Sequence, residues 1–184
     1  MKVLFVSSGN RGISPIVRNQ GDSLLSQDIA VDFFPIKGKG LLGYLSNVGK
    51  LRKYIRENSF DIIHAHYSLT AFTASLALAA PLVVSLMGSD VKKGFVYRQL
   101  IQLFAFFFSW KTIIVKSEDM KASLKIGRAM VIPNGVDMHR FCELPQSDSQ
   151  KRLGWDTNKK HLLFSADINR PEKNYMLLKR AIGL

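Results

Sequence analysis

The sequence predicts an α/β fold with a Rossmann-like parallel sheet that carries helices on both faces. Short runs rich in β-branched residues alternate along the chain with longer amphipathic segments, which is typical of repeated strand–helix–strand units. The segment PLVVSL, residues 81–86, is nearly free of polar residues, as expected of a strand covered on both faces. Glycine and polar residues follow most of these runs, and ligands bind at that edge of such sheets.

The first part of the chain is expected to hold the sheet and its helices. Strands are predicted at 2–6, 29–35, 61–65, 82–86, 112–115 and 130–132, and helices near 14–26, 41–57, 69–79, 95–109 and 118–126. Capping residues mark two of the helix starts. Ser14 stands before Pro15, a favoured first helical residue, and Ser117 stands before two acidic residues that the helix dipole favours.

The chain changes character after the strand at 130–132. Pro133 lacks the N–H that a strand ladder needs, and Asn134-Gly135 favours a tight turn. Residues 144–160 are polar and rich in turn formers, which indicates a linker. A further strand over 161–167 and a helix over 173–184 are expected to follow.

We therefore expect two domains. Residues 1–145 form the first Rossmann-like domain, and residues 146–184 comprise a linker and the start of a second one.

The net charge and the cysteine count indicate which partners and which cellular compartment suit this chain. The chain has 184 residues, 47% of them hydrophobic, and a formal net charge of +12. This charge favours anionic partners, namely nucleic acid, an acidic membrane or phosphorylated ligands, although a basic surface also occurs on proteins without such a partner. A single cysteine, Cys142, excludes a disulfide within the chain and favours a reducing compartment, the cytoplasm. The N-terminus lacks a cleavage site of the secretory type, and no segment is long and apolar enough to cross a membrane.

Candidate site residues are those that follow the predicted strands. We expect the switch point of the sheet at the end of the fourth strand, where Asp90 orients a substrate hydroxyl or acts as a base. The candidates are Gly9 and Gly12 after the first strand, His66 after the third, Met87, Ser89 and Asp90 after the fourth, Asn134 and Gly135 after the sixth, and Arg170 and Lys173 in the second part.

Several candidates have an alternative interpretation. For Arg170 and Lys173 it is an ordinary turn exposed to solvent. The loop with Gly9 and Gly12 resembles a phosphate-binding loop but lacks the G-x-G-x-x-G pattern, so it is equally an ordinary strand–helix turn. Asp90 is equally a helix cap. The pair His64 and His66 lies on one side of an extended segment, but a zinc site needs a third ligand that the sequence does not supply, so no metal is predicted.

Several motifs together resemble the retaining glycosyltransferases of family 4, which have the GT-B fold. In chain order the motifs are HAHY, GSD, IPNGVD followed by Phe141, and NRPEKN. This is the order in which they occur in that family. The resemblance covers essentially the whole chain. It implies two Rossmann-like domains that face each other across a cleft, with residues 1–145 on the acceptor side and the later residues beginning the domain that binds the nucleotide-sugar donor.

The resemblance also assigns roles to the candidate residues. Gly9 and Gly12 match the loop that approaches donor phosphate and acceptor, and His66 and Asp90 match positions on the acceptor side, which we take as the catalytic candidates. Lys173, together with Arg170, matches the basic pair that grips the donor diphosphate. Those cations would stabilise the leaving group without a metal, and a nucleotide sugar serves as co-substrate with no further cofactor.

Two departures from the family pattern affect these expectations. Met87 stands where many members have a histidine, which puts an acid–base or sugar-contacting role at this position in doubt. The acidic pair that holds the donor sugar lies downstream of residue 184 in the family, so residues 1–184 alone are expected to be inactive. The expected whole reaction is hexosyl transfer to a glycan or lipid-linked acceptor in bacterial-type cell-surface polysaccharide synthesis.

A second class of function is a basic module that binds a membrane or another polyanion without catalysis. Lysine and arginine surround apolar residues in the stretch 37–58, and the segment 95–110 is rich in aromatic residues, so an anionic membrane surface is a candidate partner and the inner face of the cell membrane a candidate location. For the second segment, packing on the sheet is the favoured alternative. Nucleic acid is not expected as a partner, because the basic residues are scattered and no recognition motif is present.

Overall fold

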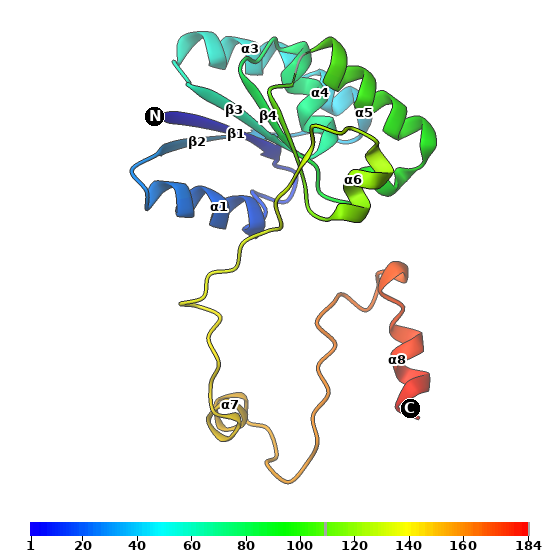
Figure 1. The fold of residues 1–184 in the computed structure, drawn as a ribbon. Helices are drawn as coiled ribbons and strands as arrows, with labels where there is room; N and C mark the ends of the chain where they lie inside the picture. Colours follow the sequence, from blue (N-terminus) through cyan, green and yellow to red (C-terminus); the bar gives the residue numbers. More distant parts are fainter. Residues whose placement is uncertain (109, 184) are drawn as a thin grey trace. The chain divides into compact units, whose positions relative to one another are not determined.

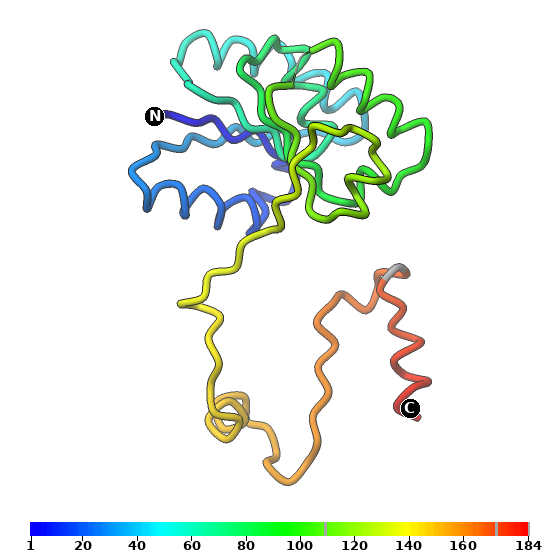
Figure 2. Tube along the Cα trace, in the orientation of Figure 1, coloured from blue at the N-terminus to red at the C-terminus, as the bar shows by residue number. Residues whose placement is uncertain are grey.

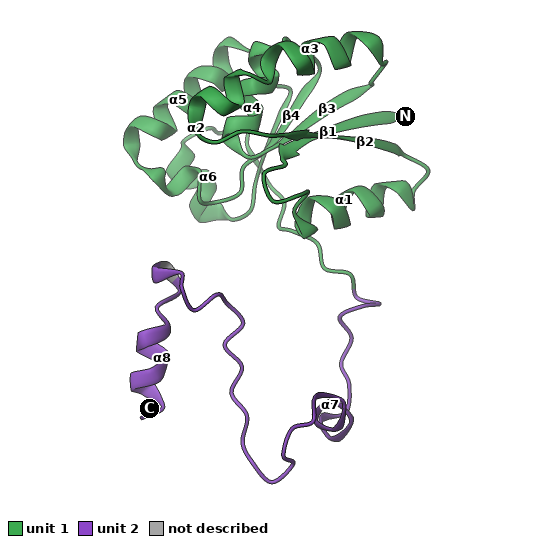
Figure 3. Ribbon diagram, turned by 180° about the vertical axis from the view of Figure 1, so that it is seen from behind, with its two compact units in different colours: residues 1–137 green, residues 138–184 purple. Residues whose placement is uncertain are grey.

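The computed structural model describes residues 1–108 and 110–183. It divides into two compact units, Met1–Asp137 and Met138–Leu184, shown in green and purple in Figure 3.

A parallel sheet forms the centre of the first unit, as the sequence predicted. In the described residues six strands pair in the order β2-β1-β3-β4-β5-β6, and every pairing is parallel (Figure 1). The strands are β1 (Lys2–Ser8), β2 (Ala30–Ile36), β3 (Ile62–His66), β4 (Leu82–Ser85), β5 (Thr112–Val115) and β6 (Met130–Val131). Each lies within two residues of its predicted bounds at either end.

The strand order reverses between β1 and β3, and this corrects the predicted switch point. The chain runs from β1 outward to β2, then crosses to the other side of β1 and continues in one direction from β3 to β6, a path that can be followed in Figure 2. The prediction at the end of the fourth strand was wrong, because β4 has sequence-consecutive neighbours, β3 and β5, on both sides.

The helices lie on both faces of this sheet. Figure 1 shows α1 on one side, with α3, α4 and α5 on the other. The helices of the first unit are α1 (Pro15–Leu25), α2 (Gly40–Leu45), α3 (Val48–Glu57), α4 (Ser68–Leu76), the 3-10 turn η1 (Val91–Lys93), α5 (Phe95–Phe107) and α6 (Glu118–Leu124).

The predicted caps are confirmed at both helix starts. Ser14 Oγ accepts a hydrogen bond from the Val17 N–H at 3.4 Å, and Ser117 Oγ accepts one from the Met120 N–H at 3.3 Å. The segment predicted as one helix over 41–57 is instead two helices. Asn47 lies between them, and its side-chain amide donates to the carbonyl oxygens of Lys37 at 2.8 Å and Gly43 at 2.6 Å, which fixes the break.

Each face of the sheet has its own apolar core. On one face Val17 of α1 packs against Val3 and Phe5 of β1 in a small cluster, while the larger core on the other face lies under α2 to α6. The helix α4 is buried along most of its length, and its Ser75 Oγ accepts a hydrogen bond from the indole N–H of the fully buried Trp110 at 2.8 Å. The larger core therefore holds the unit together around α4.

The segment after β6 differs from its prediction. Residues 132–137 have no regular structure, and Gly135 does not take the positive φ that the expected Asn134-Gly135 turn would favour. Since this segment is exposed, no packing forces the chain into a turn there.

The second unit contains helices rather than the expected strand. It comprises α7 (Gln146–Leu153), the 3-10 turn η2 (Pro171–Lys173) and α8 (Tyr175–Ala181). The expected linker at 144–160 thus includes a helix. The shorter α8 lies within the expected helix over 173–184, whose last residue lies outside the described residues. Residues 161–167 form no strand, because no other strand pairs with them in the described part of the unit.

A glycine substitution tests the close approach of β1 to β2. A Cβ on Gly9 would lie 2.5 Å from Pro35 Cβ, so Gly9→Ala forces the two chains apart and is expected to lower the free energy of unfolding by about 1–3 kcal/mol. Gly127 has open space around its Cβ position, and Gly127→Ala is the control, with an expected change within about 0.5 kcal/mol. Urea denaturation measures both, and equal stabilities for the two variants would contradict the packing argument.

Candidate functional site

Two unpartnered polar side chains lie at the reversal of strand order. Ser7 near the end of β1 and His66 at the end of β3 follow the paired residues Val6 and Ala65, so they are neighbours across the two strands. Both are buried, yet Ser7 Oγ and both ring nitrogens of His66 have no hydrogen-bond partner in the protein. Because buried polar groups are nearly always hydrogen-bonded, this pair indicates a place that a ligand or water completes.

Aromatic packing holds the His66 ring in place. Its ring centroid lies 4.2 Å from that of His64, and the two rings stack at 29°. Phe5 contacts both imidazoles edge-on, with centroids 5.2 Å from His64 and 4.6 Å from His66. His64 differs from its neighbour in having a partner, since its Nε2 lies 2.9 Å from Ser85 Oγ. Of the two histidines, His66 thus remains available for a ligand.

The electrostatics of this site favour neutral histidines. Burial, and then the positive charge of Lys116, lowers the pKa of His64 to about 4. Burial, then His64 and Lys116, lowers the pKa of His66 well below its ordinary value. Burial also lowers the pKa of Lys116, which lies half-buried just after β5. At neutral pH the His66 imidazole can therefore exchange hydrogen bonds with a hydroxyl group without carrying a charge.

The loop between β1 and α1 forms a hollow of about 420 Å³. Its lining residues are Ser8, Asn10, Arg11, Gly12, Ile13, Ser14 and Pro15. The Asn10 side chain ties this loop to Gly38, donating to its carbonyl oxygen at 2.7 Å and accepting from its N–H at 2.8 Å. Gly12 has φ +79° with open space around it, so the loop needs glycine there for its backbone conformation.

Gly9 has a reason for being glycine that the sequence did not reveal. It is buried, its N–H donates to the Ile36 carbonyl at 2.8 Å, and Pro35 fills the position that a side chain would take. The predicted role in approaching phosphate or acceptor stays a prediction for Gly9 and Gly12, with Gly12 the exposed member of the pair.

Asp90 caps the turn η1 and also joins two segments of the chain through backbone hydrogen bonds, a set of contacts that we call the clamp. Its carboxylate is 0% exposed and accepts backbone hydrogen bonds from Met87 at 3.0 and 3.2 Å, from Ser68 at 3.1 Å and from Val91 at 3.1 Å. Burial raises its pKa, while the hydrogen bonds from the backbone oppose that rise. The contacts join the loop after β4 to the start of α4, so the helix-cap interpretation describes the geometry and the catalytic role stays a prediction.

The other predicted residues do not gather around His66 in any recorded contact. Met87 is half-buried, with its backbone N–H held by Asp90, and Ser89 is exposed. Asn134 and Gly135 are exposed in the irregular segment 132–137. Their predicted cleft roles remain untested.

Arg170 and Lys173 belong to the second unit. Both are exposed, and they flank and end the short turn η2 ahead of α8, so they stand close together in the chain as the sequence indicated. That they bind the diphosphate of the donor stays a prediction.

The sequence placed Ser7 and Lys116 among the polar residues that follow the first and fifth strands, but assigned neither of them a role in the site. The signal for Ser7 was its place in the alternation along the first strand, where odd-numbered Val3 and Phe5 lie on the same side. The signal for Lys116 was its position directly after a strand. In the described residues no group of three or more His, Cys, Asp or Glu could hold a metal ion.

Replacing Asp90 tests the clamp. Asp90→Ala leaves three backbone N–H groups without an acceptor, two of them buried and one half-buried, and is expected to lower the free energy of unfolding by about 3 kcal/mol or more. Asp119, exposed in the first turn of α6, provides the control, since Asp119→Ala is expected to cost less than about 1 kcal/mol. Denaturant titration measures both. A loss for Asp90→Ala no greater than the control's would contradict the clamp.

The buried histidines predict a loss of stability in mild acid. Because the pKa of His64 falls to about 4 on folding, only the unfolded chain takes up this proton between pH 6.5 and 4, and the free energy of unfolding falls as the pH falls through that window. By pH 5 the loss from His64 alone is about 2 kcal/mol, and His66 adds to it in the same direction.

The variant His66→Phe shows how much of this pH-dependent loss of stability comes from His66 and how much from His64. The variant is expected to be at least as stable as the parent at pH 7, because an unpartnered imidazole gives way to an apolar ring, and to lose less stability between pH 7 and pH 5. Urea denaturation at both pH values measures this. An unchanged pH dependence together with reduced stability at pH 7 would show that His66 has a partner in the protein.

Comparison with known proteins agrees with this fold. Sucrose-phosphate synthase from Thermosynechococcus elongatus superposes with a TM-score of 0.66 at 13% identity, over 85% of this chain and 53% of that one. Anabaena Alr3699/HepE, solved in complex with UDP and glucose, superposes with a TM-score of 0.57 at 24% identity, over 84% of this chain and 50% of that one. A solved fragment of the same sucrose-phosphate synthase, matched at 13% identity and a TM-score of 0.57, is covered over 96% of its length by 82% of this chain.

These matches also bear on length and family. The chain spans about half the length of the two longer structures. No curated protein matches it. The model of the family described as Glycosyltransferase Family 4 matches residues 10–140, which is most of the chain and nearly all of the first unit. The chain therefore belongs to glycosyltransferase family 4, and its first unit has the Rossmann-like architecture of GT-B enzymes.

Proposed function

We propose that residues 1–137 form the acceptor-side domain of an enzyme that transfers a sugar from a nucleotide sugar to a glycan or lipid-linked acceptor. The observation that carries this proposal is the pair of buried, unpartnered side chains, Ser7 and His66, at the reversal of strand order. In open α/β sheets ligands bind just outside the carboxyl ends of the strands at such a reversal. Family membership supports the transferase class.

The chemistry of the site suits a sugar hydroxyl. His66 is neutral at neutral pH and can accept a proton in a hydrogen bond from an acceptor hydroxyl, while Ser7 Oγ offers both a donor and an acceptor. Lys116 adds a positive charge nearby, suited to a phosphate on the acceptor or the donor. In this proposal Gly12, Met87 and Ser89 line the wall around these groups, and Asn134 and Gly135 extend it.

We propose that Asp90 supports the site through the backbone and does not contact the substrate. Its carboxylate fixes the backbone between β4 and η1, which holds Met87 and Ser89 beside the sheet edge. A direct catalytic role would require the carboxylate to exchange backbone partners for substrate.

The donor proposed for the whole enzyme is a nucleotide sugar. The structure of Alr3699/HepE holds UDP and glucose, which makes UDP-glucose the first candidate to test. Arg170 and Lys173 would hold the diphosphate and stabilise it as it leaves, so the transfer would need neither a metal nor another cofactor. Retention of the anomeric configuration is proposed on the resemblance to the retaining enzymes of the family alone. Residues 1–184 alone are proposed to be inactive.

The proposed setting is the cytoplasmic face of a bacterial-type cell membrane, in the synthesis of cell-surface polysaccharide. The net charge of +12 supports attraction to anionic lipid. Among the described helices none is long and apolar enough to cross a membrane. A non-catalytic membrane module is the second candidate function, which the exposed leucines of α2, Leu41 and Leu42, favour.

Chemical-shift mapping tests the proposal on the 184-residue chain. A polyprenyl-diphosphate-linked monosaccharide in detergent, and the free glycan, are added in turn to the ¹⁵N-labelled protein, with UDP-glucose in a separate arm. The acceptor probes are expected to shift the amide signals of Ser7, Gly12 and Lys116, and His66→Phe is expected to weaken their binding at least tenfold, the loss of one or more buried hydrogen bonds.

Two results would contradict the proposal. Acceptor probes that leave these amides unchanged would remove the acceptor site, and equal binding by the parent and His66→Phe would remove His66 from it. UDP release from UDP-glucose by the 184-residue chain alone would support the transferase class but overturn the proposed inactivity.

A further inference from the structure

The outward side of α5 carries an unusual set of exposed apolar side chains. Six large residues are between 40% and 81% exposed, and we refer to them as the outer face of α5: Phe95, Val96, Leu100, Leu103, Phe106 and Phe107. Their spacings of three, four, seven and eleven residues place them on one side of a 13-residue helix. Apolar patches of this kind are rare on proteins that remain alone in solution.

The opposite side of α5 is already buried in the core of the first unit. Ile101 and Ala105 are fully covered, and Phe104 and Phe108 pack beside them against the larger core. The packing on the sheet that was favoured for this segment is thus present, but it uses only one side of the helix. The helix also carries three polar residues, Arg98, Gln99 and Gln102, but most of its outward side is apolar and has no apolar partner among the described contacts.

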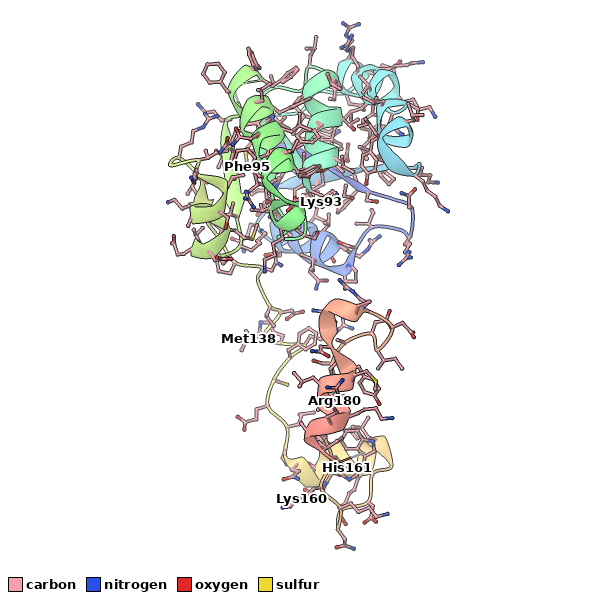
Figure 4. All side chains as sticks on the ribbon, turned by 90° about the vertical axis from the view of Figure 1, so that its right-hand side faces the viewer. Lys93, Phe95, Met138, Lys160, His161 and Arg180 are labelled. Atoms are coloured by element: carbon pink, nitrogen blue, oxygen red, sulfur yellow. The ribbon has the colours of Figure 1, made fainter. Side chains whose placement is uncertain are left out.

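Positive charge lies near both ends of α5, although Lys93 Nζ also lies over the rings of Tyr67 and Tyr97, 5.2 and 4.7 Å from their centroids. Lys92 and Lys93 precede the helix, and Figure 4 shows Lys93 and Phe95 at its start. At the other end Arg128 donates a hydrogen bond to the Ala105 carbonyl at 2.8 Å, and Lys111 is exposed. No Asp or Glu occurs in the sequence from residue 91 to residue 117.

We propose that the outer face of α5 lies in the surface of an anionic lipid membrane. An apolar face rich in phenylalanine on a helix with cations near its ends is an arrangement by which helices lie in the headgroup region, where lysine and arginine pair with lipid phosphates. Thirteen residues of helix are about 20 Å long, too short to cross a bilayer, so the helix lies parallel to its surface. The inference rests on the membrane location proposed above and names the element that makes the contact.

Charge favours lipid over a second copy of the chain. A two-fold dimer through the outer face would align the two helices antiparallel or parallel. Either arrangement brings the cations near the ends of α5, Lys92, Lys93, Lys111 and Arg128, towards those of the other copy without any acid between residues 91 and 117. An anionic surface neutralises these charges, while a copy of the same face repeats them.

Vesicle sedimentation tests this inference. The 184-residue chain is mixed with vesicles of phosphatidylglycerol and phosphatidylcholine in equal parts, and with vesicles of phosphatidylcholine alone. Binding is expected to be stronger to the anionic vesicles and to weaken as salt is raised. Phe106→Ser combined with Phe107→Ser is expected to lower the partition coefficient by about tenfold or more, because two apolar rings no longer enter the lipid.

A matched variant controls for the general loss of apolar surface. Leu162→Ser combined with Leu163→Ser removes an adjacent exposed pair from the second unit, 60% and 76% exposed, and is expected to leave binding unchanged. Lys92→Gln combined with Lys111→Gln tests the cations near the ends of α5 and is expected to weaken binding to the anionic vesicles by about fivefold for each charge removed. Circular dichroism confirms that each variant is folded.

Three outcomes would overturn the inference. They are no binding by the parent chain, equal binding by the phenylalanine variant, and a lipid-free dimer that the phenylalanine variant breaks while vesicles bind neither protein. The chemical-shift titration with the free glycan described above, run without lipid, separates this inference from the proposed function. A phenylalanine variant that still binds glycan but not vesicles supports both, and vesicle binding without any glycan response supports only the lipid contact.

Discussion

The pairing of β1 with β2 on one side and β3 on the other is the constraint on which the site depends. After β1 the chain passes through α1 on one face of the sheet, and after β3 it passes through α4 on the opposite face. The two helices therefore leave in opposite directions from the ends of these neighbouring strands, and neither helix covers both strand ends. Polar side chains can be held there without protein partners, and Ser7 and His66 occupy that place.

Burying the His66 imidazole without hydrogen-bond partners lowers the stability of the fold, and the packing around the ring offsets this loss. The ring is buried between His64 and Phe5, which fixes its orientation, and its low pKa means that folding disfavours its protonated form. An apolar residue would pack there without an unpaired nitrogen. A family 4 glycosyltransferase gains from the imidazole only if a hydroxyl or water completes it, which is the stability–function compromise common at binding sites.

Much of the architecture followed from the sequence, because the buried strands are short β-branched runs whose burial on two faces leaves few polar residues. The caps at Ser14 and Ser117 were also predictable, since capping is local chemistry. Strand order is not local, and so the switch point was placed at β4 instead of between β1 and β3. The expected strand at 161–167 failed for a related reason, because a strand needs a partner and the apolar run alone does not supply one.

The site was predictable only in part. His66 was named from its place at a strand end, but its unpartnered state depends on cross-strand register, which also brings Ser7 beside it. Asp90 was weighed equally as base and cap, and only the three-dimensional path of α4 shows that it also holds the Ser68 N–H. The exposure of the outer face of α5 likewise depends on which side of an apolar helix meets the core.

The ¹⁵N spectrum of the imidazole rings between pH 4 and pH 8 tests the central claim most directly. If His66 is a buried, neutral group that awaits a hydrogen-bonding ligand, its imidazole ring will stay neutral, with a proton on only one of its two nitrogens, well below pH 6.5, and His64 will titrate near pH 4. A ring at position 66 that takes up its proton at about pH 6.5, as in an unfolded peptide, would show that the end of β3 is open to water and that this account of the site is wrong.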